Sequence, residues 1–145
     1  MREITETIYV AKDGTRFLYK SQCEKHEAEY EKAEAEFDAL PKITKYNAGD
    51  DYQLNPFACD DTLYCIPITS MDVVEKIKNW CQFNDTSGVS AETMVSKSDI
   101  GERIFFSEYE GYFTRFGTPD ELKKLFCGKI NELSNIKCEV EGENA

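Results

Sequence analysis

The stretch "YVAKDGTRFLYKSQCEKHEAEYEKAEAEF", residues 9–37, predicts a β-hairpin followed by a long amphipathic helix. Upstream of the Asp13-Gly14 pair, residues 4–10 alternate between two faces as a strand does, and "RFLYK" (16–20) supplies the returning strand. Glycine takes a positive φ without steric cost, so Asp-Gly between two such stretches indicates a tight turn. The hairpin is expected to turn at residues 12–15.

The helix after the hairpin has one apolar face. Ser21 and Glu24 match a capping box and Pro41 forbids continuation, so the helix is predicted to run from Ser21 to about Leu40. Side chains suited to packing recur every three or four residues: Cys23, His26, Tyr30, Ala33, Phe37 and Leu40. This seam, within residues 22–40, is expected to face either the rest of the fold or a second subunit in a homodimer.

The rest of the helix surface is acidic, with only Lys25 and Lys32 to offset seven carboxylates: Glu24, Glu27, Glu29, Glu31, Glu34, Glu36 and Asp38. Such a face can imitate a row of phosphates and bind a positively charged groove. Five of these residues are the candidate partner-binding set: Glu24, Glu27, Glu31, Glu34 and Asp38. The alternative interpretation is a solvated face that keeps the chain soluble.

Composition limits the classes of function. The chain has 145 residues, a formal charge of −11, 41% hydrophobic residues and 12% aromatic residues, which is enough apolar surface for a folded domain. A surface of this sign repels nucleic acid and anionic lipid and attracts basic proteins. No run has the length of a signal peptide core or a membrane span, and none of the six cysteines forms a C-x-x-C pair. We therefore expect a cytoplasmic protein with reduced cysteines.

The second half of the chain predicts a small sheet with helices. Residues 42–61 have no periodicity and are expected to be a connector, and 62–69 read as a strand in which Pro67 marks an edge or a strand end. Thr69 or Ser70 should cap a helix that buries Val73, Val74, Ile77, Trp80 and Cys81. A polar loop is expected at 84–101.

Two further strands, "RIFFSE" (103–108) and "YFTRF" (112–116), are joined at residues 109–111. Thr118-Pro119-Asp120-Glu121 is a second capping box, opening a helix expected to bury Leu122, Leu125, Phe126, Ile130 and Leu133. The predicted class is α+β, and the chain is expected to be one domain. Its parts are the hairpin and acidic helix (1–41), the connector (42–61), an α+β unit (62–135) and a frayed acidic tail (136–145).

Catalytic and metal-binding patterns are weak. His26 is the only histidine, and a Cys23-x-x-His26 half-site would need further ligands such as Cys59 and Cys65. Asp50-Asp51 and Asp60-Asp61 could bind a divalent cation, but no complete calcium loop is present. A packed histidine and solvated loops are the simpler interpretations. No catalytic residue, metal or cofactor is assigned, and a metal-dependent enzyme is the third of the functional classes considered.

An arginine and aromatic cluster offers a second binding hypothesis. Arg103 and Arg115 lie on the two strands of the late hairpin, with Tyr109 and Tyr112 between them. Bidentate contacts to phosphate and stacking on a base would suit a nucleotide second messenger. The alternative is an ordinary hairpin with one aromatic face in the core and its charges outside.

The pattern "Y-V-A-K-D-G-T-R-F … S-Q-C-E-K-H-E", residues 9–27, resembles the opening of small phage-encoded accessory proteins. The resemblance covers about the first quarter of the chain and carries no functional residue with it. It implies a phage or prophage product in a bacterial cytoplasm that disarms host defence. Such a protein either occupies the nucleic-acid-binding surface of a CRISPR effector or restriction enzyme, or acts as a sponge for a nucleotide messenger.

Overall fold

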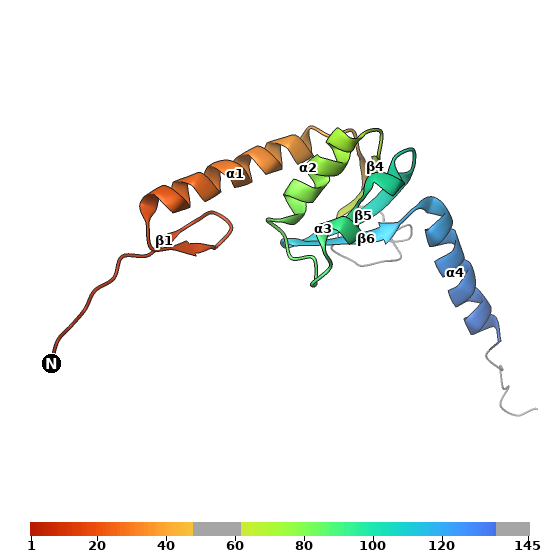
Figure 1. Ribbon diagram of the computed structural model, residues 1–145. Coiled ribbons are helices and arrows are strands. Elements are labelled where there is room, and N and C mark those ends of the chain that lie inside the picture. Colours follow the sequence, from red (N-terminus) through yellow and green to blue (C-terminus); the bar gives the residue numbers. More distant parts are fainter. Residues whose placement is uncertain (48–61, 136–145) are drawn as a thin grey trace, which may run out of the picture.

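The structure of the chain, a computed structural model, describes residues 1–47 and 62–135, as Figure 1 shows. Most of the expected connector and all of the expected tail, with Cys59 and the paired aspartates at 50–51 and 60–61, lie outside the described residues. The described part confirms the α+β class. A two-stranded hairpin and a four-stranded antiparallel sheet combine with helices.

The N-terminal hairpin is shorter than predicted. Strand β1 (Tyr9–Val10) pairs with β2 (Arg16–Phe17), and Gly14 has a φ of 87°, as the turn requires. The Asp13 carboxylate accepts a hydrogen bond from the Thr15 amide at 3.1 Å and so fixes the turn. Residues 4–8 alternate in sequence, but they are not strand, because β2 ends at Phe17, shortly before the helix begins.

Helix α1 (Lys20–Asp38) confirms the long acidic helix but not its predicted cap. Its N-cap residue is Tyr19, which makes no side-chain capping bond. Ser21 lies already inside the first turn, so the capping box expected from Ser21 and Glu24 is wrong. The C-cap is Ala39, close to the predicted end at about Leu40.

The sheet has the order β3-β4-β5-β6, from β3 (Ile43–Asn47), β4 (Thr62–Pro67), β5 (Arg103–Tyr109) and β6 (Tyr112–Gly117). Residues 43–47 were expected to be connector and instead pair with β4. Pro67 is the last residue of β4, which fits the predicted strand end, although β4 is not an edge strand. The turn between β5 and β6 consists of Glu110 and Gly111, both with positive φ.

Helix α2 (Met71–Cys81) begins at its cap Ser70 and buries all five side chains predicted to face inward. The loop expected at 84–101 contains a short helix α3 (Ala91–Met94) and a 3-10 turn η1 (Lys97–Asp99). In the turn, the Asp99 carboxylate accepts from the Ser96 amide at 2.9 Å. Local capping therefore gives this polar segment regular structure.

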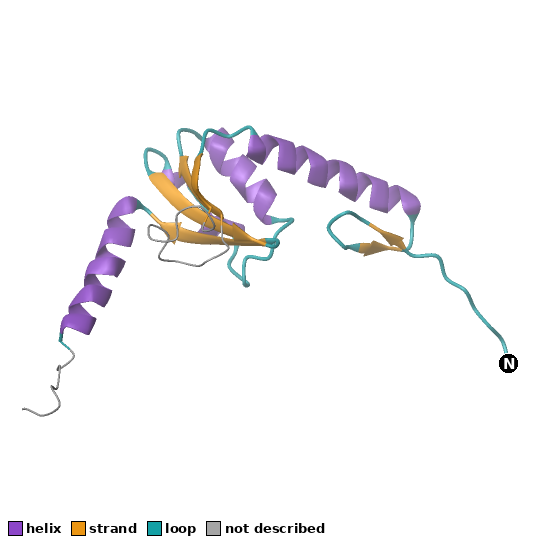
Figure 2. Ribbon diagram, turned by 180° about the vertical axis from the view of Figure 1, so that it is seen from behind, coloured by secondary structure: helices purple, strands orange, loops and turns teal. Residues whose placement is uncertain are grey.

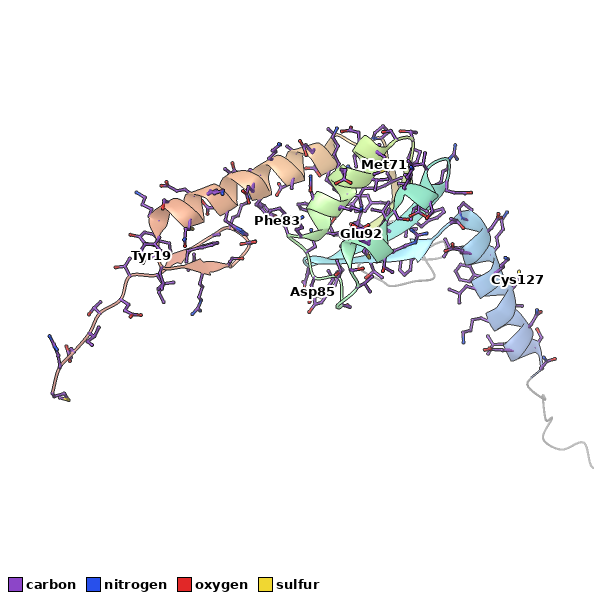
Figure 3. The ribbon with its side chains drawn as sticks, in the orientation of Figure 1. Tyr19, Met71, Phe83, Asp85, Glu92 and Cys127 are labelled. Atoms are coloured by element: carbon purple, nitrogen blue, oxygen red, sulfur yellow. The ribbon has the colours of Figure 1, made fainter. Side chains whose placement is uncertain are left out.

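Helix α4 (Pro119–Ser134) has the predicted capping box of Thr118 and Glu121, but its apolar face is not buried as predicted. Leu122 is 8% exposed, whereas Leu125, Ile130 and Leu133 are 52%, 60% and 66% exposed. Helix α4 contacts β5 and β6, and its C-terminal part extends away from the body (Figures 1 and 3).

One core joins the two halves of the chain. Phe37 from α1 stacks on Trp80 of α2 with ring centroids 5.3 Å apart and meets Phe113 of β6 edge-on at 5.6 Å. Ile66 and Phe106 complete the same buried cluster. The seam of α1 is therefore covered by this chain's own α2, hairpin and sheet. Its members are buried or half-buried, so little of the seam is left for the homodimer expected through residues 22–40.

The molecule forms an arch, with α1 as its span, as Figures 1 and 2 show from opposite sides. The hairpin lies at one end, and the sheet with α4 lies at the other. Among the helices of residues 1–47 and 62–135, none is long and apolar enough to cross a membrane.

Candidate protein-binding surface on the acidic helix

The packing of α1 determines which carboxylates face outward. Ala33 and Phe37 are buried against α2 and the sheet, so the helix cannot rotate about its axis without opening the core. At the other end, Cys23 is buried beneath the hairpin, and His26 and Tyr30 are half-buried. The orientation of the acidic residues follows from these anchors.

The hairpin is fastened to α1 around His26. The His26 Nε2 atom lies 2.7 Å from Asp13 Oδ2, and the ring packs between Phe17 and Phe83 at centroid distances of 5.1 and 5.4 Å. The Lys12 amide donates to Glu27 Oε1 at 3.1 Å. Burial acts to raise the pKa of Asp13, but the hydrogen bonds from His26 and Thr15 outweigh it and hold the pKa below its ordinary value.

The five candidate residues Glu24, Glu27, Glu31, Glu34 and Asp38 form a single stripe along α1. At about 100° per residue they fall within a sector of about 80°, and they span about 21 Å of helix. Glu24, Glu31 and Asp38 are exposed, while Glu27 and Glu34 are half-buried on the side of the hairpin and the sheet. The structure therefore brings this predicted set together as one linear surface, which we call the acidic stripe.

Of the three lysines of α1, two lie off the acidic stripe, and Lys20 lies in line with it, one turn before Glu24. Lys25 and Lys32 lie about 120–140° around the helix from its centre. Lys20 approaches Glu24 only to 3.9 Å, at the N-terminal end of the stripe, and both side chains are largely exposed. Exposed pairs of this kind contribute little. Between Glu24 and Asp38 the acidic stripe therefore contains no lysine of α1.

A carboxylate from the sheet extends the acidic stripe beyond the helix. Glu108 of β5 accepts a hydrogen bond from the Tyr64 hydroxyl at 3.0 Å. Burial, and then the charges of Asp38 and Glu34, raise the pKa of Glu108 above its usual range, against the opposing effects of Tyr64 and Lys42. Sequence reasoning missed this residue, although strand alternation places it on the same face as Ile104 and Phe106.

Lys42 closes this end of the stripe. Its amine donates to the carbonyls of Phe37 and Asp38 at 2.8 and 3.0 Å and lies 4.8 Å from the centre of the Phe37 ring. Burial lowers its pKa, although the Asp38 and Glu108 charges act in the other direction. The charge of Lys42 therefore stabilises the C-terminal carbonyls of α1, and its amine forms no ion pair with a carboxylate of the stripe.

The four residues of the nucleotide hypothesis do not converge. Phe106 is paired with Arg115 in the sheet, so Arg115 shares the buried face of Ile104 and Phe106, while Arg103 has the opposite parity and lies on the other face. Tyr109 and Tyr112 are paired at the turn, six residues along β5 from Arg103. The two-residue turn already implies this register, so the sequence contained the information.

Arg115 is engaged within the fold. Its guanidinium forms two hydrogen bonds to the Asp99 carboxylate, at 2.8 and 3.1 Å, and a third to the Met94 carbonyl at 3.2 Å. Burial opposes ionisation of Asp99, but Arg115 and the Ser96 amide hold its pKa below the ordinary value. Arg115 therefore joins the loop to the sheet.

No catalytic arrangement forms around Cys23 and His26. Burial raises the pKa of the Cys23 thiol, and the charges of Glu27, Glu24 and Asp13 raise it further, so the thiol is not activated. His26 is engaged with Asp13. In the described ranges, no group of three or more histidine, cysteine or acidic residues is arranged to hold a metal ion.

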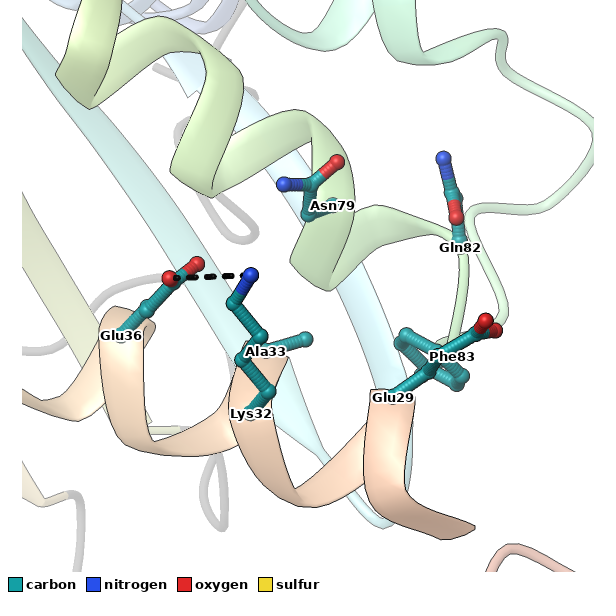
Figure 4. A pocket seen from close by; sticks show the side chains of 7 residues that line it. All are labelled: Glu29, Lys32, Ala33, Glu36, Asn79, Gln82 and Phe83. Atoms are coloured by element: carbon teal, nitrogen blue, oxygen red, sulfur yellow. Dashed lines mark ion pairs between the residues drawn. The ribbon is translucent and has the colours of Figure 1, made fainter. Parts of the chain in front are cut away.

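A shallow pocket of about 320 Å³ lies on the other side of α1, where it faces α2 (Figure 4). Its lining residues are Glu29, Lys32, Ala33, Glu36, Asn79, Gln82 and Phe83. Lys32 and Glu36 approach to 4.0 Å across its edge. The pocket is lined by both acidic and basic side chains, and in this it differs from the acidic stripe, whose five side chains are all acidic.

Comparison with known proteins gives no match, since no family model, curated protein or solved structure is significantly similar to the chain.

Proposed function

We propose that this chain is a non-enzymatic binding protein that inhibits a basic, nucleic-acid-binding protein by occupying its positively charged groove. One observation carries the proposal. Five carboxylates lie in one line along α1, and Lys25 and Lys32 of the same helix lie well away from this line. A face needed only for solubility would not require this separation, because mixed charges serve solubility equally well.

The geometry of the acidic stripe suits a groove that binds nucleic acid. One carboxylate falls about every 5 Å along α1, compared with one phosphate per 3.4 Å along a strand of B-form DNA. The stripe is rigid, because α1 is packed along its seam, and a preorganised surface loses little entropy on binding. Its charge would also increase the association rate with a basic partner.

The partner class is proposed from the resemblance of residues 9–27 to phage-encoded accessory proteins. We place the chain in a bacterial cytoplasm, where CRISPR effectors and restriction enzymes present basic grooves to nucleic acid. The net charge of −11 argues against direct binding of nucleic acid by the chain itself. The inhibitor would therefore compete with the nucleic acid for the groove.

The test is a competition assay on a panel of purified CRISPR effectors and restriction enzymes, each bound to its labelled nucleic acid. Fluorescence anisotropy should show displacement from at least one member when the chain is added, with weaker displacement as salt rises. The proposal fails if no panel member loses its nucleic acid at low salt.

The sponge for a nucleotide messenger receives no support from the geometry, because Arg103 and Arg115 lie on opposite faces of the sheet. A thermal-shift screen of linear and cyclic nucleotides distinguishes the two functions, since a tight ligand raises the apparent stability by mass action. A clear rise in melting temperature with a nucleotide would favour the sponge over the inhibitor. A shift that requires a divalent cation and is abolished by a chelator would instead favour the metal-dependent class.

A further inference from the structure

Helix α4 carries an apolar face that is largely exposed at Leu125, Ile130 and Leu133. Its apolar side chains fall within a sector of about 140° on the helix: Leu122, Leu125, Phe126, Ile130 and Leu133. Three of them are more than half exposed, and only Leu122 is buried against the sheet. Contiguous exposed apolar surface of this kind often marks an interaction site.

The helix needs a covering surface for its own stability. It has 16 residues, its main contacts are with β5 and β6, and Gly128 lies in its interior. Isolated helices of this length are marginal in water even when their residues favour helix, and an interior glycine weakens them further. A partner on the apolar face would bury the side chains that are now exposed, Leu125, Ile130 and Leu133.

The charge of α4 favours a second copy of the chain as that partner. The helix contains three acidic residues (Asp120, Glu121 and Glu132) and three basic residues (Lys123, Lys124 and Lys129), so its net charge is zero in a chain of −11. The basic protein proposed above would find no excess of negative charge on this helix. Two copies of α4 can approach each other without net repulsion.

The position of α4 in the arch supports the same conclusion. The helix lies at the end opposite the hairpin and projects away from α1, as Figures 1 and 2 show. Two copies joined through α4 would keep their acidic stripes apart, and charges farther apart than about 8 Å are largely screened at physiological salt. The dimer would therefore leave both stripes free.

We propose that α4 pairs with α4 of a second copy, across a two-fold axis, to form a homodimer. Two-fold dimers are the commonest oligomers, and each apolar face covers the other in such a pair. The helix is about 24 Å long, so a pair of helices buries less than the ~800 Å² per partner of a standard interface. A dissociation constant in the micromolar range is therefore expected.

The experiment is sedimentation equilibrium of the full chain from about 1 to about 200 µM, beside two variants with matched changes of charge. The face variant carries Ile130→Glu and Leu133→Glu. The control carries Asn131→Glu and Ser134→Glu, which lie on the other side of α4. The wild type and the control should pass from 16.6 kDa to twice that mass, and the face variant should remain at 16.6 kDa.

The single tryptophan provides a check on folding. Trp80 lies in the core, where its ring packs against Tyr30 and Phe37 of α1. Its fluorescence should therefore be the same in all three proteins if the body stays folded. A wild type that stays monomeric at 200 µM overturns the proposal, and so does equal loss of the dimer in the control. A dimer that survives in the face variant but is lost after Val10→Asp with Leu18→Asp would assign the interface to the hairpin instead.

Discussion

At the scale of single residues, His26 acts as a fastening between the hairpin and α1. Its ring contacts Asp13, Phe17 and Phe83, and Asp13 also holds the hairpin turn through the Thr15 amide. This one histidine therefore links the turn to the start of the acidic stripe. Its role is to position the hairpin, and the Cys23 thiol three residues earlier takes no part in it.

We predict that Asp13→Asn loosens the hairpin. The amide oxygen of asparagine can still accept from the Thr15 amide, but the charged partner of His26 is lost, which should cost about 1 kcal/mol. Hydrogen exchange at the Ala11 amide, which donates to Thr15 at 2.8 Å, should become roughly fivefold faster. The matched control is Asp85→Asn, because Asp85 makes the same type of turn with Ser87, and its backbone bonds go to Gly111 and Phe113 of the β5–β6 hairpin. Unchanged exchange at Ala11 in Asp13→Asn would contradict this role.

The raised pKa of Glu108 predicts a variant that is more stable than the wild type. Burial and the neighbouring carboxylates make the folded state favour the protonated acid, so ionised Glu108 lowers the stability of the fold at neutral pH. Glutamine removes the charge and can still accept from the Tyr64 hydroxyl. Glu108→Gln should therefore raise the melting temperature at pH 7.

The stability of Glu108→Gln should depend on pH differently from that of the wild type. Because its folded pKa lies above the unfolded value, the wild type gains stability as pH falls through the folded pKa, and Glu108→Gln does not. The advantage of the variant should therefore shrink towards pH 4. Glu102→Gln, an exposed site, is the control for loss of one negative charge. A lower melting temperature for Glu108→Gln at pH 7 would show that the ionised group stabilises the fold.

At the scale of elements, the two serines near helix starts should behave differently. The Ser70 hydroxyl accepts from the Val73 amide at 3.4 Å and caps α2, whereas Ser21 lies inside the first turn of α1 and caps nothing. Ser70→Ala should cost about 1 kcal/mol of unfolding free energy, and Ser21→Ala less than about 0.5 kcal/mol. Urea unfolding of both variants measures this directly. Equal losses of unfolding free energy in the two variants would show that Ser21 caps α1 as predicted.

Periodicity predicted most of the elements and failed where pairing or coverage decides the outcome. The alternating strands at 103–117 and the three- and four-residue spacing in α1, α2 and α4 depend on neighbours in the chain, so the sequence revealed them. Strand β3 was missed because Ile43–Asn47 becomes a strand only by pairing with β4. The same cause shortened the first hairpin. The face of α4 was predicted correctly as apolar, but periodicity does not tell whether anything covers it.

The candidate sites show the same limit. The acidic stripe was predictable, because residues on one helix have a fixed geometry. Arg115 was misjudged because its partner, Asp99, lies in a loop whose position depends on the tertiary fold. Glu108 was missed because it meets Asp38 and Glu34 only when the sheet packs against α1.

At the scale of the whole molecule, the arch separates two surfaces of different chemistry. The acidic stripe lies on α1, which forms the span, and the exposed apolar face lies on α4 at one end (Figure 1). If both proposals hold, a dimer would present two acidic stripes, and a partner with two basic grooves would be bound more tightly by linkage of the two contacts. Loss of the dimer would then weaken inhibition without abolishing it.

The measurement that tests the acidic stripe most directly is inhibition by two charge-reversed variants in the competition assay. Glu24, Glu31 and Asp38 are the exposed members of the stripe and are changed together to Lys. The control changes three exposed carboxylates elsewhere, Glu29, Glu75 and Glu102, to Lys. Both variants therefore have the same net charge.

We expect the stripe variant to lose at least a factor of ten in inhibition, because each exposed carboxylate that faces a basic groove contributes about 0.2–1 kcal/mol and reversal adds repulsion. The salt dependence of the remaining inhibition should also become shallower. The control should inhibit within about threefold of the wild type. Equal losses in the two variants would show that net charge alone is responsible, and an unchanged stripe variant would contradict the role of the stripe altogether.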